Sequence, residues 1–258
     1  SQYMHFLCRP DAEALLAAGI ARVVVAMGDP DARVRGRGLE ALRRGGVEVV
    51  EGVCGAAARE LLAAYVKLRT RARPWVICKW AQTADGCLAL PPGEGRWISG
   101  EASRAAAHEL RALCDGVCVG VGTVLADDPR LTNRSGRGRQ PARLVLDGRL
   151  RTPPGCTLLA EKGGGPVLIA TTADAAAAEA TAAEALRRAG AELLALPAAG
   201  GGVDLGALLE ELGRRQWTYL LVEGGPTLLR AFLAGGLADE LDVFVSPRRV
   251  GAPAAGLP

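Results

Sequence analysis

Residues 219–227 have the sequence YLLVEGGPT, and this stretch indicates the class of fold. A short apolar run leads into Glu223, two glycines follow, and Pro226 precedes a further apolar run. An apolar run bounded by glycines predicts a buried strand, and proline is favoured in the first turn of a helix. A strand that passes directly into a helix is the repeating element of α/β proteins, so we expect that class.

The same alternation extends along the rest of the chain. We expect strands at 21–27, 47–50, 75–81, 116–121, 142–147, 166–170, 219–223 and 240–246. We expect helices at 11–18, 36–45, 55–67, 101–113, 174–189, 204–214 and 227–234. Several of the strands are continuous apolar runs, which is typical of a parallel sheet covered on both faces. The charged segment 68–74 predicts a boundary between a small α/β segment over residues 1–70 and a larger α/β domain over residues 75–258.

Composition excludes several classes of protein. The formal net charge of +3 is too small to indicate a nucleic-acid partner. No apolar run approaches the ~20 residues of a membrane span, and residues 1–10 lack the pattern of a secretory signal. The seven cysteines are odd in number and form no CxxC motif, so we expect neither a disulfide framework nor a zinc site. This cysteine usage favours a reduced, intracellular protein.

Two segments that combine a strand end with glycines are candidate ligand sites. In 219–227 the paired glycines allow a ligand to approach the backbone, and the start of the helix offers free N–H groups to an anion. The segment 120–134, GVGTVLADDPRLTNR, has two glycines, Thr123 and two carboxylates. It lacks the third glycine of a dinucleotide-binding fingerprint. Plain turns are the alternative at both places.

Charged residues in two predicted elements are the other candidates. Arg104, His108 and Arg111 share one face of the helix at 101–113, which suits either an anion or a solvated surface. Lys79 lies in an apolar strand, where an unpaired ammonium is costly to bury. We therefore expect Lys79 to face a polar cleft, with the edge of the sheet as the alternative.

The order of these pieces resembles a known family. The segments that carry the resemblance are PWVICKWAQTADG (74–86), GRWIS (95–99), ELRALCDGVCVGVGTVLADDPRLTNR (109–134), RLVLD (143–147), LLVEGGPTLL (220–229) and GLADELDVFVSPRRVG (236–251). They are similar to the reductase domain of the bifunctional riboflavin-biosynthesis deaminase–reductases. The resemblance implies a dihydrofolate-reductase-like α/β fold. It also implies NADPH-dependent reduction of the ribosyl group of 5-amino-6-(5-phosphoribosylamino)uracil to a ribityl chain.

Residues 9–70 are similar to the second half of the zinc deaminase domain in the same family. The zinc chemistry needs an H-x-E motif and paired cysteines, and no H-x-E occurs in this sequence. Asp11 stands where the resemblance places the last zinc-ligating cysteine, and Cys8 has no companion. We therefore expect a truncated, cytidine-deaminase-like segment that binds no zinc and has no deaminase activity.

The resemblance also assigns binding residues, position by position. It implies NADPH contacts at Ala81, Trp97, Thr123, Asp127, Gly225, Pro226, Thr227, Leu228, Leu229, Arg230 and Ala231. It implies substrate contacts at Gly95, Arg111, Leu131, Arg134 and Glu223, and supporting roles for Lys79 and Asp85. It identifies neither a catalytic proton donor nor the arginine that would select NADPH over NADH.

The resemblance further implies a homodimer in the cytoplasm, with a phosphorylated ribosylaminopyrimidine as substrate and with neither nucleic acid nor membrane as partner. A plastid is the alternative location if a targeting segment precedes residue 1. Members of the family continue into further strands, so we expect this chain to be a fragment with a C-terminally incomplete reductase domain. One alternative function is a non-catalytic nucleotide-binding or assembly module. The other is a nucleic-acid binder that acts through Arg134, Arg137, Arg139 and Arg143.

Overall fold

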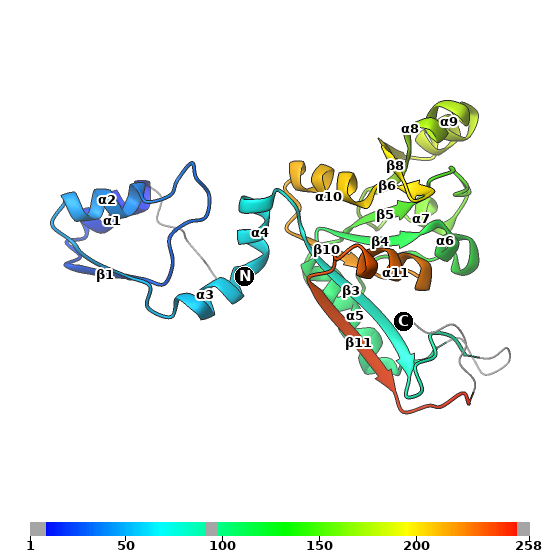
Figure 1. Ribbon diagram of the computed structural model, residues 1–258, viewed down its shortest axis with the longest axis horizontal. Helices are drawn as coiled ribbons and strands as arrows, with labels where there is room; N and C mark the ends of the chain where they lie inside the picture. Colours follow the sequence, from blue (N-terminus) through cyan, green and yellow to red (C-terminus); the bar gives the residue numbers. More distant parts are fainter. Residues whose placement is uncertain (1–8, 91–96, 252–258) are drawn as a thin grey trace. The chain divides into compact units, whose positions relative to one another are not determined.

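The computed structural model describes residues 9–90 and 97–251 (Figure 1). The chain divides into two compact units, Ser1–Ala72 and Arg73–Pro258. In the described part, no helix has both the length and the apolar character needed to cross a membrane.

The first unit is built on two short parallel strands, with Arg22 opposite Glu48. Its elements are α1 (Arg9–Ala17), β1 (Arg22–Val25), α2 (Arg37–Arg44), β2 (Glu48–Glu51), α3 (Gly55–Leu61) and α4 (Ala63–Arg71). Ala12, Leu42 and Val47 form its small buried core, because α1, α2 and the start of β2 turn their apolar side chains toward one another.

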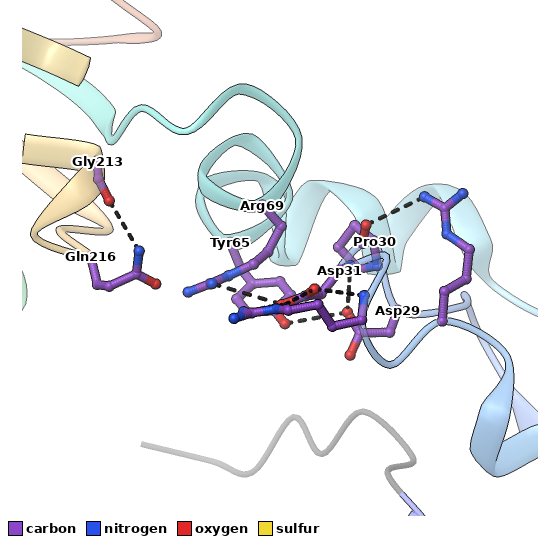
Figure 2. Close-up of polar contacts among 9 residues, drawn as sticks. Asp29, Pro30, Asp31, Tyr65, Arg69, Gly213 and Gln216 are labelled. Carbon is purple, nitrogen blue, oxygen red and sulfur yellow. Dashed lines mark hydrogen bonds and ion pairs between the residues drawn. The ribbon is translucent and has the colours of Figure 1, made fainter. Parts of the chain in front are cut away.

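A polar cluster ties the loop after β1 to α4 (Figure 2). The Tyr65 hydroxyl donates to Asp29 Oδ1 at 3.3 Å, and the backbone N–H of Asp31 donates to the same oxygen at 2.8 Å. Arg33 pairs with Asp31 at 2.6 Å, and Arg69 approaches the same carboxylate at 3.8 Å while its guanidinium lies over the Tyr65 ring. The hydrogen bonds from Arg33 hold the pKa of Asp31 well below its usual range.

The second unit is built on a seven-stranded sheet in which every pair of neighbours is parallel. Its strands, in spatial order, are β11 (Glu240–Ser246), β3 (Trp75–Thr83), β10 (Tyr219–Val222), β4 (Gly116–Gly120), β5 (Ala142–Leu146), β6 (Val167–Thr172) and β7 (Ala191–Leu196). Its other elements are α5 (Glu101–Leu113), α6 (Val121–Asp127), α7 (Thr157–Ala160), α8 (Ala173–Ala178), α9 (Ala180–Arg188), β8 (Ala198–Ala199), β9 (Gly202–Val203), α10 (Leu205–Arg214) and α11 (Pro226–Ala234).

Apolar side chains cover both faces of this sheet. Successive residues of a strand point to opposite faces, so Val76 and Cys78 join one buried cluster and Ile77 joins the other. The first cluster includes residues of α10 and α11, and the second includes residues of α6, α7 and α9. The parallel sheet expected from the apolar runs is confirmed.

The differences from the expected elements are local. Strand β7 was not expected, because its sequence AELLAL has no β-branched residue and resembles a helix; pairing with β6 determines its conformation. The predicted strand 116–121 ends at Gly120, where the chain passes directly into α6. The predicted helix 55–67 is divided at Leu62, and its second part continues to Arg71.

Two arginines of the proposed nucleic-acid surface are engaged within the second unit. The Arg143 side chain is buried, and its guanidinium donates to the carbonyls of Gly165 at 2.6 and 2.9 Å and of Leu158 at 2.6 Å. Arg139 pairs with Asp115 at 2.7 Å. Arg143 therefore anchors the loop after α7 and does not contribute to an exposed basic surface.

Candidate active site

A cavity opens where the carboxyl ends of the central strands meet, the usual ligand-binding edge of an α/β sheet. We call it the first cavity; its volume is about 310 Å³. It lies beside the end of β10, the start of α11 and one face of α5. The residues that line it are Lys79, Trp80, Ala81, Leu88, Trp97, Ile98, Ser99, Arg104, Ala107, His108, Arg111, Arg134, Glu223, Gly224, Gly225, Pro226 and Leu229.

A buried ion pair forms part of the wall of the first cavity. Arg111, in the last turn of α5, donates from Nε to Glu223 Oε1 at 2.9 Å and from Nη2 to Oε2 at 2.7 Å. Its third nitrogen, Nη1, donates to the carbonyl of Thr132 at 3.1 Å. Burial acts to raise the pKa of Glu223, but the charge and hydrogen bonds of Arg111 outweigh it and keep the pKa below its ordinary value. The carboxylate is therefore ionised at neutral pH and held in a fixed orientation.

His108 is held in its neutral form beside this pair. The backbone N–H of Arg134 donates to His108 Nδ1 at 3.2 Å, so that nitrogen carries no proton. Partial burial, together with the charges of Arg111 and Arg134, lowers the pKa of His108. The loop that presents Arg134 is folded around Asn133, whose amide nitrogen donates to the carbonyl of Arg137 at 2.6 Å.

The remaining charged groups give the first cavity a positive character. The Arg104 guanidinium lies 5.3 Å from the centre of the Trp97 ring, and its Nη1 donates to the carbonyl of Ser99 at 3.2 Å. Lys79 Nζ lies 5.3 Å from the centre of the Phe244 ring. Four cationic side chains and one carboxylate line the cavity, namely Lys79, Arg104, Arg111, Arg134 and Glu223. This balance suits a ligand that carries negative charge.

A second cavity of about 800 Å³ lies at the same edge of the sheet, next to the ends of β4 and β5. Glycines form a large part of its walls. Eight of the lining residues are glycines: Gly120, Gly122, Gly148, Gly200, Gly201, Gly202, Gly206 and Gly235. The others are Val121, Leu146, Arg149, Arg151, Ala199, Val203, Asp204, Leu205, Thr227, Leu228, Ala231 and Leu237. Such a surface lets an extended ligand approach the main chain closely.

Helix α11 separates the two cavities. Pro226 and Leu229, one turn apart, face the first cavity, whereas Thr227 and Leu228 face the second. Gly225 caps the start of the helix, and the space where its side chain would be contains only the Thr123 hydroxyl, 3.9 Å from that position. Pro226 has no N–H and the N–H of Leu228 donates to the Gly225 carbonyl at 3.1 Å, so in the first turn of α11 it is the N–H of Thr227 that a ligand beside this open space can use.

The structure brings most of the assigned residues to these two cavities. Nine of them line the first cavity: Lys79, Ala81, Trp97, Arg111, Arg134, Glu223, Gly225, Pro226 and Leu229. Thr227, Leu228 and Ala231 line the second cavity, and Thr123 lies at the edge of the space beside Gly225. The expected stripe of Arg104, His108 and Arg111 faces the first cavity, as does Lys79.

Besides Thr123, four of the assigned residues that the structure describes do not line either cavity. Asp127 and Arg230 are exposed, and Leu131 is buried next to Thr132, whose carbonyl accepts from Arg111. Asp85 instead accepts hydrogen bonds from the N–H groups of 250 and 251, both at 2.9 Å, and so ties the turn after β3 to the segment after β11. Gly95 lies outside the described residues.

Sequence reasoning missed one part of the site. The turn 148–151 after β5 lines the second cavity with Gly148 and two arginines, yet it was not among the assigned positions. A glycine directly after the apolar strand 142–147 is the same signal that identified 120–122 and 223–225. Within the described ranges, no group of three or more His, Cys, Asp or Glu side chains is placed to hold a metal ion.

Comparison with known proteins gives the following relatives. Residues 74–257 match the RibD C-terminal domain family. The riboflavin biosynthesis protein RibD of Aquifex aeolicus is 39% identical over 243 residues, which cover 94% of this chain and 65% of that protein. The counterpart from Actinobacillus pleuropneumoniae is 37% identical over 249 residues and is also covered over 65% of its length. This chain therefore spans about 65% of the length of these curated relatives.

Among solved structures, Acinetobacter baumannii RibD superimposes with a TM-score of 0.81 at 33% identity, over 96% of this chain and 67% of that chain.

Proposed function

The chain belongs to the RibD C-terminal domain family, and from this premise we propose that it is an NADPH-dependent reductase of a phosphorylated ribosylaminopyrimidine. Its second unit has a mostly parallel, dihydrofolate-reductase-like α/β fold. The proposed substrate is 5-amino-6-(5-phosphoribosylamino)uracil, whose ribosyl group would become a ribityl chain. The observation that carries the proposal is the position of α11, whose first turn lies between a charged cavity and a glycine-lined cavity.

The first cavity fits the substrate by its charges. A sugar phosphate needs cationic donors, and Arg134 and Arg104 offer guanidinium groups at this cavity. The fixed carboxylate of Glu223 can accept hydrogen bonds from sugar hydroxyls or from the pyrimidine N–H groups. Because Arg111 holds Glu223 at two points, the carboxylate needs no rearrangement when a ligand binds.

The second cavity and the start of α11 fit a dinucleotide. The open space beside Gly225 would receive a pyrophosphate, with the Thr123 hydroxyl and the backbone N–H of Thr227 as donors. The glycines that line the second cavity leave room for the rest of the nucleotide. NADPH, when bound, supplies the hydride for the reduction.

The protein's own contribution is binding, orientation and exclusion of water. Trp80 of β3 and Trp97 of the segment before α5 line the first cavity and would cover an apolar ring. At neutral pH the ionised Glu223 has no proton to donate, and the neutral His108 is a very weak acid. We therefore expect the proton that accompanies the hydride to come from water.

Titration with NADPH, followed by fluorescence, tests the proposal. We expect saturable binding, and loss of the NADPH signal only when the phosphoribosylaminouracil substrate is present. If NADPH binds but is not oxidised in the presence of the substrate, the proposed reductase activity is contradicted. That outcome favours the alternative of a non-catalytic nucleotide-binding module. Failure to bind NADPH at all would overturn the proposed function together with the assigned cofactor contacts.

A further inference from the structure

His108 lines the first cavity, but the proposed reaction gives it no role, because the neutral imidazole is too weak an acid to supply the proton. Its contact is with the main chain: Nδ1 accepts a hydrogen bond from the backbone N–H of Arg134 at 3.2 Å. Arg134 is exposed at the same cavity, and its guanidinium has no ion pair with another described residue. The histidine is therefore connected to an available cation of the site through the backbone.

The chain immediately before this arginine is held by other contacts. The Thr132 carbonyl accepts from Arg111 Nη1 at 3.1 Å. The backbone of Asn133 is paired with the side-chain amide of Gln140, which accepts from its N–H and donates to its carbonyl, both at 2.8 Å. We therefore expect this loop to keep its fold without the imidazole. What His108 fixes is the N–H of the residue that carries the guanidinium.

Helix α5 thereby sets the positions of two charged groups of the site. His108 and Arg111 are one turn apart on the same face of the helix. Arg111 holds the Glu223 carboxylate at two points, and His108 holds the backbone of Arg134. A ligand that contacts both Glu223 and Arg134 therefore meets a carboxylate and a guanidinium whose separation is determined by one rigid element.

From these contacts we propose that His108 is a positioning residue: by accepting the N–H of Arg134 it holds the guanidinium of that arginine where the phosphate of the substrate binds. The inference rests on the proposed function, because it assumes that a phosphorylated substrate occupies the first cavity. The contribution of His108 is to recognition of the phosphate, with no part in the transfer of the hydride.

The contact depends on the protonation of the ring. An imidazolium carries a proton on both nitrogens, so Nδ1 of a charged His108 cannot accept from a backbone N–H. Partial burial lowers the pKa of His108 below its ordinary value of 6.5, as do the charges of Arg111 and Arg134, while Glu223 and the Thr132 carbonyl act in the opposite sense. Phosphate recognition should therefore be complete at neutral pH and should weaken as the pH falls through this pKa.

The test measures the preference for phosphate. This preference is the ratio of kcat/KM for 5-amino-6-(5-phosphoribosylamino)uracil to kcat/KM for the same compound without its phosphate, so a general loss of folded protein cancels. We expect His108→Leu to lower the ratio about three- to tenfold, the effect of losing one hydrogen bond. His108→Asn should keep the ratio, because its amide oxygen can accept in the place of Nδ1. Ala102→Leu, at an exposed position of α5 that lines neither cavity, is the control and should change nothing.

A double substitution determines whether the histidine acts through the arginine. Arg134→Ala alone should lower the ratio about tenfold or more, because it removes a charge-assisted contact. In that background His108→Leu should cause no further loss, since the two residues contribute to one interaction. A further loss as large as in the unsubstituted chain would mean that His108 acts independently of Arg134, and would overturn the inference.

The same ratio, measured from pH 5.5 to pH 8, tests the dependence on protonation. The second ionisation of a phosphate lies near pH 6, but it affects the unsubstituted chain and His108→Asn equally. We expect the preference for phosphate to fall more steeply toward low pH in the unsubstituted chain than in His108→Asn. A preference that instead rises on acidification would mean that charged His108 binds the phosphate directly, and would contradict the inference.

A failure of this inference can be distinguished from a failure of the proposed function. If the unsubstituted chain oxidises NADPH with neither form of the substrate, the proposed function fails and the inference fails with it. If it reduces both forms equally well, or if His108→Asn loses as much of the preference as His108→Leu, the role of His108 is wrong and the reductase proposal stands.

Discussion

The two cavities on either side of α11 are built in different ways. The first is lined by charged and aromatic side chains, and its central ion pair is held by hydrogen bonds between segments more than 100 residues apart. The second is lined by the backbone of glycines, with its two arginines at an exposed turn. In the first, a change at Arg111 or Glu223 also removes a contact that holds α5 against the end of β10. In the second, the chain can alter the ligand it accepts while the fold stays the same.

The difference suggests that stability and ligand binding are coupled in one cavity and separate in the other. Glu223 and Arg111 hold α5 against the end of β10 and at the same time face the proposed substrate. Gly122, in contrast, lines the second cavity, and a Cβ added there would meet no atom within 4 Å. Substitutions at three positions test this difference.

The largest effect is expected for Glu223→Gln. This change leaves Arg111 buried without a counter-charge, and breaking a buried ion pair costs about 3–5 kcal/mol of the free energy of unfolding. We also expect kcat/KM for the substrate to fall at least about 100-fold, because the carboxylate that orients the ligand is lost. Urea denaturation and the rate of NADPH oxidation measure the two effects.

Glu192→Gln is the matched control for that variant. Glu192 pairs with Arg215 at 2.6 Å in the same unit, but its side chain is 51% exposed, against 9% for Glu223. An exposed pair is worth about 1 kcal/mol or less, so stability and activity should be nearly unchanged. Equal losses in the two variants would show that burial of the pair is not what makes Glu223 important.

A smaller effect, confined to binding, is expected for Gly122→Leu. A Cβ at Gly122 would meet no atom within 4 Å, so the fold can accommodate the side chain, and replacing a helical glycine adds a few tenths of a kcal/mol or more of stability. The side chain would extend into the second cavity, and we expect the dissociation constant for NADPH to rise about tenfold. A fluorescence titration measures the change.

Gly155→Leu provides the comparison for this variant. Position 155 is equally open, with no atom within 4 Å of an added Cβ, and it lines neither cavity. NADPH affinity should be the same as in the unsubstituted chain. If Gly122→Leu also left the affinity unchanged, the second cavity would not be the cofactor site.

The smallest effect is expected for His108→Gln and concerns pH. The pKa of His108 is lowered on folding, so between that value and the unfolded value of about 6.5 the folded state binds fewer protons than the unfolded state. In this pH window the free energy of unfolding therefore rises with pH. Above about pH 6.5 His108 is neutral in both states and causes no further change. The variant should lose that part of the slope when unfolding is measured from pH 5 to pH 8. An unchanged slope would mean that His108 is not buried in its neutral form.

The sequence predicted strands correctly where the apolar pattern of a segment agrees with its place in the sheet. The runs around Val117, Leu144 and Leu221 are apolar on both sides, and all three became central strands. Strand β7 was missed because nothing in its Ala/Leu composition is typical of a strand; only its neighbour β6 makes it one. The end of β4 at Gly120 was misplaced by one residue, since valine continues beyond it into α6.

The candidate site was predictable in part. The helical spacing of Arg104, His108 and Arg111 placed them on one face, and that face lines the first cavity. The pairing of Arg111 with Glu223 could not follow from spacing, because it depends on the position of α5 relative to β10. The turn 148–151 did carry a signal, because a glycine directly follows the apolar strand 142–147, but the two exposed arginines beside it have no pattern of their own.

The strand order has a consequence for how the second unit acquires its structure. Strands β4, β5, β6 and β7 are neighbours in the sheet in the same order as in the chain, so each can pair soon after it is synthesised. Strand β3 precedes them all, yet both of its partners, β10 and β11, come at the other end: Trp75 pairs with Tyr219, more than half of the chain length later. Contacts of such long sequence separation form slowly. On the ribosome β3 would remain without its partners until β10 and β11 had emerged, and we expect its pairing to follow that of β4 to β7 and to be the slow step in the folding of this sheet.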